Sequence, residues 1–122
     1  MNWPMNSMDT PLLGLLERSL DVAAFRQALI ASNLANVDTP GYRTRDLDFR
    51  SELRRAALAA GSAEWTPRVR EVPGLIERPD GNNVSLEREG LLLAQIQLQF
   101  RASAELVRAE LRRLLLAINE GR

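Results

Sequence analysis

The residues of this chain that could do chemistry are carboxylates and arginines, because it contains no His, no Cys and no Lys. Asp46 and Asp48 could form a carboxylate pair for acid–base catalysis. In an extended segment, however, residues two apart share a face, and the flanking Arg43, Arg45 and Arg50 indicate charge balancing instead. Without a plausible base or nucleophile set, the sequence predicts that the chain is not an enzyme.

Two other patterns are of the kind that binds ligands. Residues 80–83, Asp-Gly-Asn-Asn, resemble the start of a calcium loop, but the acidic residue at its twelfth position is missing, which favours a simple turn. In the arginine runs at 54–55, 108 and 112–113, Arg55, Arg108 and Arg113 each have a Glu residue three positions before them, as ion pairs along helices require. With 16 basic and 16 acidic residues, the chain has no positive excess for nucleic acid. We predict no metal, no cofactor, no nucleic-acid partner and no small-molecule substrate.

The elements that position these residues are two long amphipathic helices, one near each end of the chain. Thr10 and Pro11 are a good N-cap and first helical residue, and helical spacing continues to about Asn36. Ser85 caps the second helix, which continues to about residue 119 before Gly121. Apolar residues spaced by three or four predict a coiled-coil-like assembly seam, within one subunit or between subunits. Its residues are Leu13, Leu16, Leu20, Ile30 and Leu34 on the first helix and Ile96, Phe100, Val107, Leu111 and Leu114 on the second.

The predicted fold class is mainly α, with a short irregular or β-containing insert between the long helices. Residues 1–9 are predicted to be a flexible N-terminus. Residues 10–60 contain the first helix, an Asn and Pro-Gly turn, and an extended connector that leads to a short helix over 51–60. Residues 61–84 form the insert, in which 68–72 and 75–78 are predicted to pair as a β-hairpin, and residues 85–122 form the second helix.

The first helix has more apolar surface than one partner helix can cover. Leu12, Leu15, Val22 and Phe25 lie beside the seam, and two antiparallel helices hide only one face each. This surplus favours partner chains. The first ten residues contain no Arg and the apolar run 12–16 is short, so we expect neither a cleaved signal peptide nor a membrane span.

The end of the first helix carries the most specific pattern of the chain. Asn33 and Asn36 lie one turn apart, and Thr39-Pro40-Gly41-Tyr42 follows them. Pro40 cannot continue a helix and restricts Thr39 to extended geometry, while Gly41 accepts the positive φ of a type II turn. These residue types predict an abrupt helix end, a rigid turn and an extended exit.

Residues 29–42 resemble the N-terminal signature of bacterial flagellar axial proteins, in which a helix ends in Ser-Asn-(apolar)-Ala-Asn before Thr-Pro-Gly-Tyr. Two further stretches resemble proximal rod proteins of the flagellar basal-body rod protein family. Residues 42–49, Tyr-Arg-Thr-Arg-Asp-Leu-Asp-Phe, are similar to a Tyr-x-Ala-Arg-Asp-(apolar)-Asp-Phe motif. Residues 80–89 are similar to an Asp-Gly-Asn-x-Val motif that starts the C-terminal helix. Ser85 stands where that family often has Asp, and either residue caps a helix.

The resemblance implies a structural subunit of the proximal rod, which polymerises through its terminal helices into a hollow drive shaft. The implied partners are other rod subunits, copies of the chain itself, a FliE-like adaptor at the rod base and the flagellar type III export gate. The implied location is the periplasmic rod of the basal body, reached without a cleaved signal peptide. Early export substrates resemble one another in a Phe-x-x-x-(apolar) pattern, which Phe49 with Leu53 fits, as does Phe25 with Leu29.

An alternative of another class is a cytoplasmic helical adaptor or chaperone that binds partner helices. It predicts a stably helical dimer in isolation. The rod hypothesis predicts a monomer whose terminal helices are frayed until assembly orders them.

Overall fold

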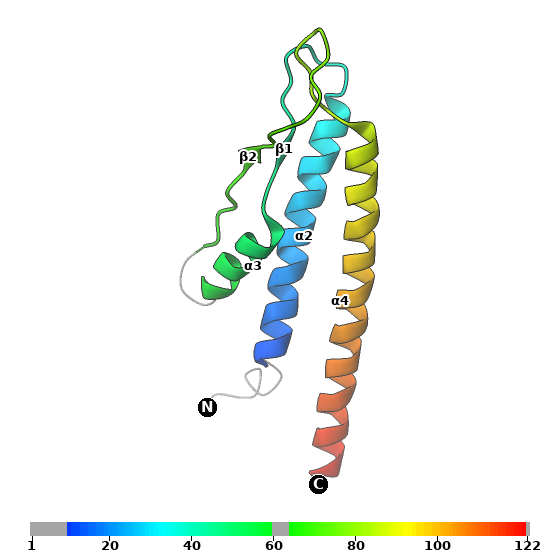
Figure 1. Cartoon of the computed structure of the whole chain (residues 1–122). Coiled ribbons are helices and arrows are strands. Elements are labelled where there is room, and N and C mark those ends of the chain that lie inside the picture. Colours follow the sequence, from blue (N-terminus) through cyan, green and yellow to red (C-terminus); the bar gives the residue numbers. More distant parts are fainter. Residues whose placement is uncertain (1–9, 60–63, 122) are drawn as a thin grey trace.

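The computed structural model describes residues 10–59 and 64–121 (Figure 1). Its elements are α2 (Pro11–Ala35), β1 (Arg45–Asp46), α3 (Phe49–Leu58), β2 (Arg70–Glu71) and α4 (Leu86–Glu120). The long helices α2 and α4 lie side by side and antiparallel, α3 also packs on α2, and the insert passes over the end where α2 stops and α4 starts. The predicted fold class, mainly α with long terminal helices around a β-containing insert, is confirmed. Residues 1–9, which the sequence predicts to be flexible, lie outside the described residues.

Local signals place both ends of α2. The Thr10 side chain accepts a hydrogen bond from the Leu13 amide at 3.1 Å, and Pro11 occupies the first helical position. At the other end the Asn36 amide still donates to the carbonyl oxygen of Ser32, after which the chain turns away. The predicted bounds of this helix are therefore confirmed.

The connector and the short helix differ from the prediction by two residues. The helix α3 begins at Phe49 rather than at residue 51, because the Asp48 carboxylate accepts a hydrogen bond from the Ser51 amide at 3.2 Å and caps it. The interpretation of Asp48 as a charge-balancing group was wrong, since an N-cap carboxylate satisfies a free amide at the positive end of the helix. The predicted last residue of this helix, at position 60, is outside the described residues.

The predicted β-hairpin across Pro73 and Gly74 is wrong. The strand β2 pairs antiparallel with β1, with Arg45 opposite Glu71 and Asp46 opposite Arg70, and the segment 75–78 is not a strand. Gly74 does occupy a turn, with φ of 80°. The local turn was predictable, but the partner of β2 comes from far away in the sequence, where the connector supplies an extended edge.

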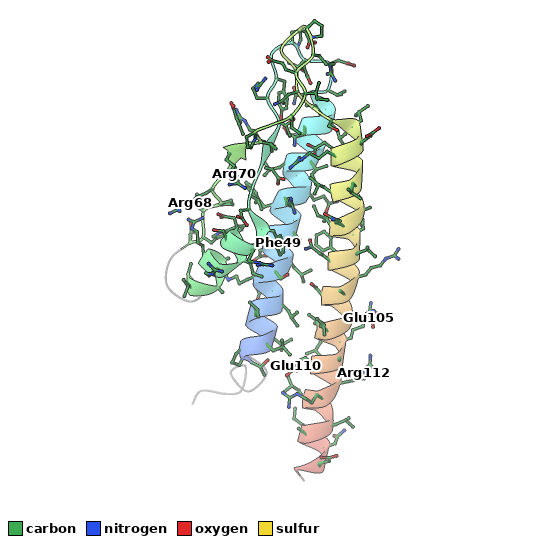
Figure 2. The ribbon with its side chains drawn as sticks, viewed as in Figure 1. Phe49, Arg68, Arg70, Glu105, Glu110 and Arg112 are labelled. Carbon is green, nitrogen blue, oxygen red and sulfur yellow. The ribbon has the colours of Figure 1, made fainter. Side chains whose placement is uncertain are left out.

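Two small apolar clusters hold the layers together. Between α2 and α3, Val22 packs with Leu47 and Ala56, and Trp65 covers them, meeting the ring of Phe25 edge to face at 6.2 Å between centroids. Between α2 and α4, Ala23 and Ile30 pack with Ile96. Phe49 contacts both clusters and lies between α3 and α2 (Figure 2). The core is thus a thin apolar layer on each of two sides of α2.

The helix α4 is the longest element. Ser85 caps it by accepting a hydrogen bond from the Arg88 amide at 3.2 Å, and Glu87 and Glu89 lie in its first turn, where the helix dipole favours negative charge. It has 35 residues against 25 in α2, so its C-terminal end extends about 15 Å further (Figure 1). Within the described ranges, neither long helix is apolar enough over a sufficient length to cross a membrane.

Candidate assembly site at the helix junction

The side-chain amide of Asn33 connects three of the segments that meet where α2 ends. Its nitrogen donates to the Arg45 carbonyl oxygen and to the Glu89 carboxylate, both at 2.9 Å. Its oxygen accepts from the Arg45 amide at 3.1 Å and from the Tyr42 hydroxyl at 3.0 Å. The side chain is only 1% exposed, and these four bonds use its full hydrogen-bonding capacity. One residue of α2 therefore fixes the turn, the strand β1 and the start of α4.

The signature turn is built as its residue types predict. Gly41 has φ of 76°, and the Tyr42 amide donates to the Thr39 carbonyl oxygen at 3.2 Å, which closes the turn around Pro40. The Asn36 side chain donates to the Ser32 carbonyl oxygen at 2.8 Å and accepts from the Thr39 hydroxyl at 3.0 Å. The six predicted signature residues, Asn33, Asn36, Thr39, Pro40, Gly41 and Tyr42, thus lie in one continuous structure.

Two residues of the insert, neither of them among the predicted site residues, complete this junction. The Asn82 side chain donates to the carbonyl oxygens of Asn36 and Thr39, both at 2.9 Å, so it satisfies backbone groups left free by the end of α2. The Arg78 guanidinium donates to the carbonyl oxygen of Val37 and, at 3.3 Å, to that of Val84. The signal for Asn82 was present in the motif at residues 80–84, but its partners lie more than 40 positions away.

Gly81 shows why the two turns of the junction can lie in contact. It has φ of 87°, and a Cβ added there would meet the Gly41 Cα at 3.3 Å. The Gly41 amide donates to the Asp80 carbonyl oxygen at 2.8 Å. The turn after α2 and the turn before α4 therefore pack backbone to backbone, and larger residues at position 81 would push them apart.

Asp46 is the centre of a buried ion cluster. Its two oxygens accept from the Nε and Nη2 atoms of Arg26, both at 3.0 Å, and its Oδ2 also accepts from Arg88 at 2.6 Å. Burial raises the pKa of this carboxyl, but the bonds from Arg26, the Leu47 amide and Arg88 outweigh that cost and hold the pKa below its ordinary value. Its predicted balancing by neighbouring arginines was wrong, because the charges that pair with it come from α2 and α4.

Glu89 belongs to the same cluster, but its pKa is shifted in the opposite direction. It is fully buried, and its Oε1 accepts from Asn33 at 2.9 Å and from Arg88 at 3.1 Å. Its Oε2 has no hydrogen-bond partner among the described residues. Burial therefore raises the pKa of Glu89, against the attraction of Arg88 and the Asn33 bond, and the nearby Asp46 charge adds to the rise. The α2–α4 contact thus contains a carboxyl that is costly to ionise.

The predicted seam residues differ in how deeply they are buried. Near the junction Ile30 and Ile96 are buried, with Leu34 and Phe100 packed against them. Leu16 is also buried, and Leu13, Leu20, Val107 and Leu114 are half-buried. Leu111 is 37% exposed, so a single chain covers it only in part. The predicted Glu–Arg pairs are present, including Glu52 with Arg55 at 2.7 Å, and Figure 2 shows Glu110 on the side of α4 that faces α2.

Comparison with known proteins decides the family. A family described as "Flagella basal body rod protein" matches residues 20–43, the segment that runs from α2 through the signature turn. The chain is 30% identical over 129 aligned residues to the flagellar basal body rod protein FlgB of Escherichia coli (strain K12), covering 86% of this chain and 91% of that protein. The chain belongs to the FlgB family of flagellar basal body rod proteins. The predicted function, a structural subunit of the basal-body rod, is confirmed by this membership.

Other FlgB proteins show the same breadth of similarity. The protein of Salmonella typhimurium is 30% identical over 129 residues, with 86% of this chain and 91% of that protein covered. The protein of Borrelia hermsii is 33% identical over 105 residues, with 69% and 78% covered. The similarity thus includes both long helices and the insert between them, and the FlgB family offers no support for the cytoplasmic adaptor or chaperone. That the chain is not an enzyme stays a prediction, consistent with the structural role of these relatives.

Replacing Gly41 by Val should impair motility. Positive φ costs an L-residue about 1–2 kcal/mol, and Val branches at Cβ, so the turn at the end of α2 would be strained. The matched control is Gly74→Val, which imposes the same strain at φ of 80° in a turn outside the junction. Swimming of complemented cells in soft agar is the measurement. Equal swimming of the two variants would contradict a special role for the junction.

Replacing Glu89 by Gln should change how stability depends on pH. Because burial raises the folded-state pKa of Glu89 above its ordinary 4.5, the folded chain binds this proton more readily than the unfolded chain. The free energy of unfolding should therefore fall as pH rises from 4.5 through the folded pKa, and Glu89→Gln should remove that fall. Asp46 has the opposite effect, because its pKa is lowered. Its contribution to the free energy of unfolding is lost only as pH falls below its ordinary pKa of 3.8. Urea unfolding at several pH values tests this, and identical pH profiles for both proteins would refute it.

Proposed function

We propose that this chain is a subunit of the proximal rod that polymerises through the outward faces of its long helices into a hollow shaft. The single observation that carries this proposal is apolar surface that the chain cannot cover by itself. The most exposed of these side chains on α4 are Leu86, Leu91, Leu98, Leu106, Leu115, Leu116 and Ile118, which are 50–65% exposed. Several large apolar side chains left exposed on one helix mark an interaction surface.

The distribution of this surface supports assembly rather than a single binding groove. On α2, Leu12 and Leu15 are 43% and 45% exposed, so both long helices carry uncovered apolar residues. The end of α4 beyond α2 carries Leu115, Leu116 and Ile118 together. A chain whose helices need neighbours on more than one side fits a packed tube of helices, because every copy then covers part of the next.

The proposed partners are other rod subunits, further copies of the chain, a FliE-like adaptor at the rod base and the flagellar type III export gate. The proposed location is the periplasmic part of the basal body, reached unfolded and without a cleaved signal peptide. The thin apolar layers around α2 support unfolding before export, since few buried side chains must be exposed to separate the helices. The hydrogen bonds of the junction are directional, which supports refolding to a single register of α2 against α4.

Substituting Leu115, Leu116 and Ile118 together by Ser should abolish incorporation of the chain into the rod. These side chains are 54%, 59% and 51% exposed, so their loss removes an intersubunit contact and leaves the core of the single chain intact. The measurements are immunodetection in purified basal bodies and circular dichroism of the purified chain. A matched control is Leu58→Ser, which removes a 79% exposed leucine from α3. Unchanged basal-body content of the triple variant would contradict polymerisation through this end of α4.

Replacing Phe49 by Ala should reduce export of the chain. In the folded chain Phe49 lies against both apolar clusters and Leu53 is half-buried, so the pair is available to an export gate only before folding. The matched control is Phe100→Ala, which removes a ring from the α2–α4 cluster but lies outside the Phe-x-x-x-Leu pattern. The measurement is the secreted fraction in a strain that exports unassembled rod subunits. Equal secretion of both variants would exclude Phe49 as the signal and leave Phe25 with Leu29.

A further inference from the structure

The face of α4 that points away from α2 carries large apolar side chains. Leu91 and Leu98 are seven positions apart and therefore on one face, and they are 64% and 65% exposed. Ile96, which packs against α2, lies on the opposite face and is fully buried. The same outward face carries Arg101 and Arg108, and Figure 2 shows Glu105 and Arg112 on it too. We call this surface the leucine face.

The remaining open side of α2 has a complementary shape. The helix is covered by α3 on one side and by α4 on another, and its third side carries Ala24, Ala28, Ala31 and Ala35, all exposed. Small side chains let a neighbouring helix approach closely, and large side chains fill the space between two helices best when they face small ones. Toward its N-terminus this side continues into Glu17 and Asp21, which are also exposed. We call this surface the alanine face.

The two faces also match in height along the molecule. Two contacts between the antiparallel helices show which of their residues lie at the same height: the Asn33–Glu89 hydrogen bond and the contact of Ile30 with Ile96. Counting residues from these contacts places every other residue to within one helical turn. On this scale Leu91 is level with Ala31 and Ala35, and Leu98 is level with Ala24 and Ala28. Arg101 is level with Asp21, and Arg108 is level with Glu17.

The charges of the two faces are therefore complementary when two copies stand side by side at one height. Among the described residues Arg101 and Glu17 have no ion-pair partner within the chain. Asp21 meets Arg18 only at 3.4 Å, and Arg108 pairs with Glu105 on the exposed surface. Surface pairs of this kind contribute little to stability but select register and partner.

We propose that the leucine face of one copy packs on the alanine face of the next, with Leu91 and Leu98 against the alanine row and Arg101 and Arg108 beside Asp21 and Glu17. The occupant of the leucine face is thus a second copy of this chain. The contact joins two different surfaces, so it is heterologous and propagates into a ring or a helical tube instead of ending at a dimer. This inference rests on the proposed function and specifies the lateral contact that it requires.

The test is disulfide cross-linking of Ala28→Cys together with Leu98→Cys in a chain that has no natural Cys. Within one copy the two positions lie on sides of the helix pair that face away from each other, so they cannot bridge, because a disulfide needs Cα atoms within about 7 Å. Between copies packed as proposed they meet. Mild oxidation of basal bodies that contain the double variant should give a ladder of dimers and larger multimers of this chain.

Single variants and a displaced pair are the controls. Ala28→Cys alone and Leu98→Cys alone should give no ladder, because each contact needs one cysteine from each face. Ala28→Cys with Arg54→Cys, which places the second cysteine on α3, should give none either. If basal bodies contain the double variant but show no ladder, or if a single variant gives dimers as efficiently, the proposed contact is wrong while the rod function stands. Absence of the unmodified chain from basal bodies would instead overturn the proposed function.

Discussion

Asn33 is a single buried amide on which the geometry of the whole chain depends. Its four hydrogen bonds reach the turn, the strand β1 and the start of α4, and they use both protons and both lone pairs of the side chain. A buried amide with any of these bonds missing would carry a desolvation cost of about 1–3 kcal/mol. Few arrangements of three chain segments satisfy all four bonds together. The angle and the register of α2 and α4 are set by that requirement.

The apolar contacts alone would specify this register less sharply. The α2–α4 seam consists mainly of Leu, Ala and Ile at three-or-four spacing, and a shift by one turn would place similar side chains against each other. The polar cluster removes that ambiguity. Asp46 needs Arg26 from α2 and Arg88 from α4 at the same time, and Glu89 needs Asn33. Buried ionic groups of this kind contribute more to a unique arrangement than to net stability.

Features that depend on neighbouring residues were the ones that sequence could predict. Thr10 and Ser85 cap their helices, and Gly41 has the positive φ that a Pro-Gly turn requires. Apart from the local cap that Asp48 forms on α3, the failures involve partners distant in sequence. Asp46 has three arginines within four positions, but its partners are 20 and 42 positions away. The segment 70–71 pairs with the connector rather than across its own Pro-Gly turn, because Thr44, Leu47 and the junction hold β1 in place beside it. The local spacing of polar and apolar residues does not indicate these distant partners.

Polar and apolar contacts have different roles in this chain, and these roles explain where each kind lies. Directional bonds are concentrated at one end of the helix pair, where they define the shape of the single chain. Non-directional apolar surface is left on the outside and along the far end of α4, where its partners are other chains. The reverse arrangement, with polar clusters outside and an apolar junction, would neither fix the shape of the chain nor attract a neighbour. Exposed polar clusters would be satisfied by water and attract no neighbour, and a purely apolar junction would let the helices slip before they assembled. A subunit that packs against other subunits on several sides therefore needs its polar network inside and its leucines outside.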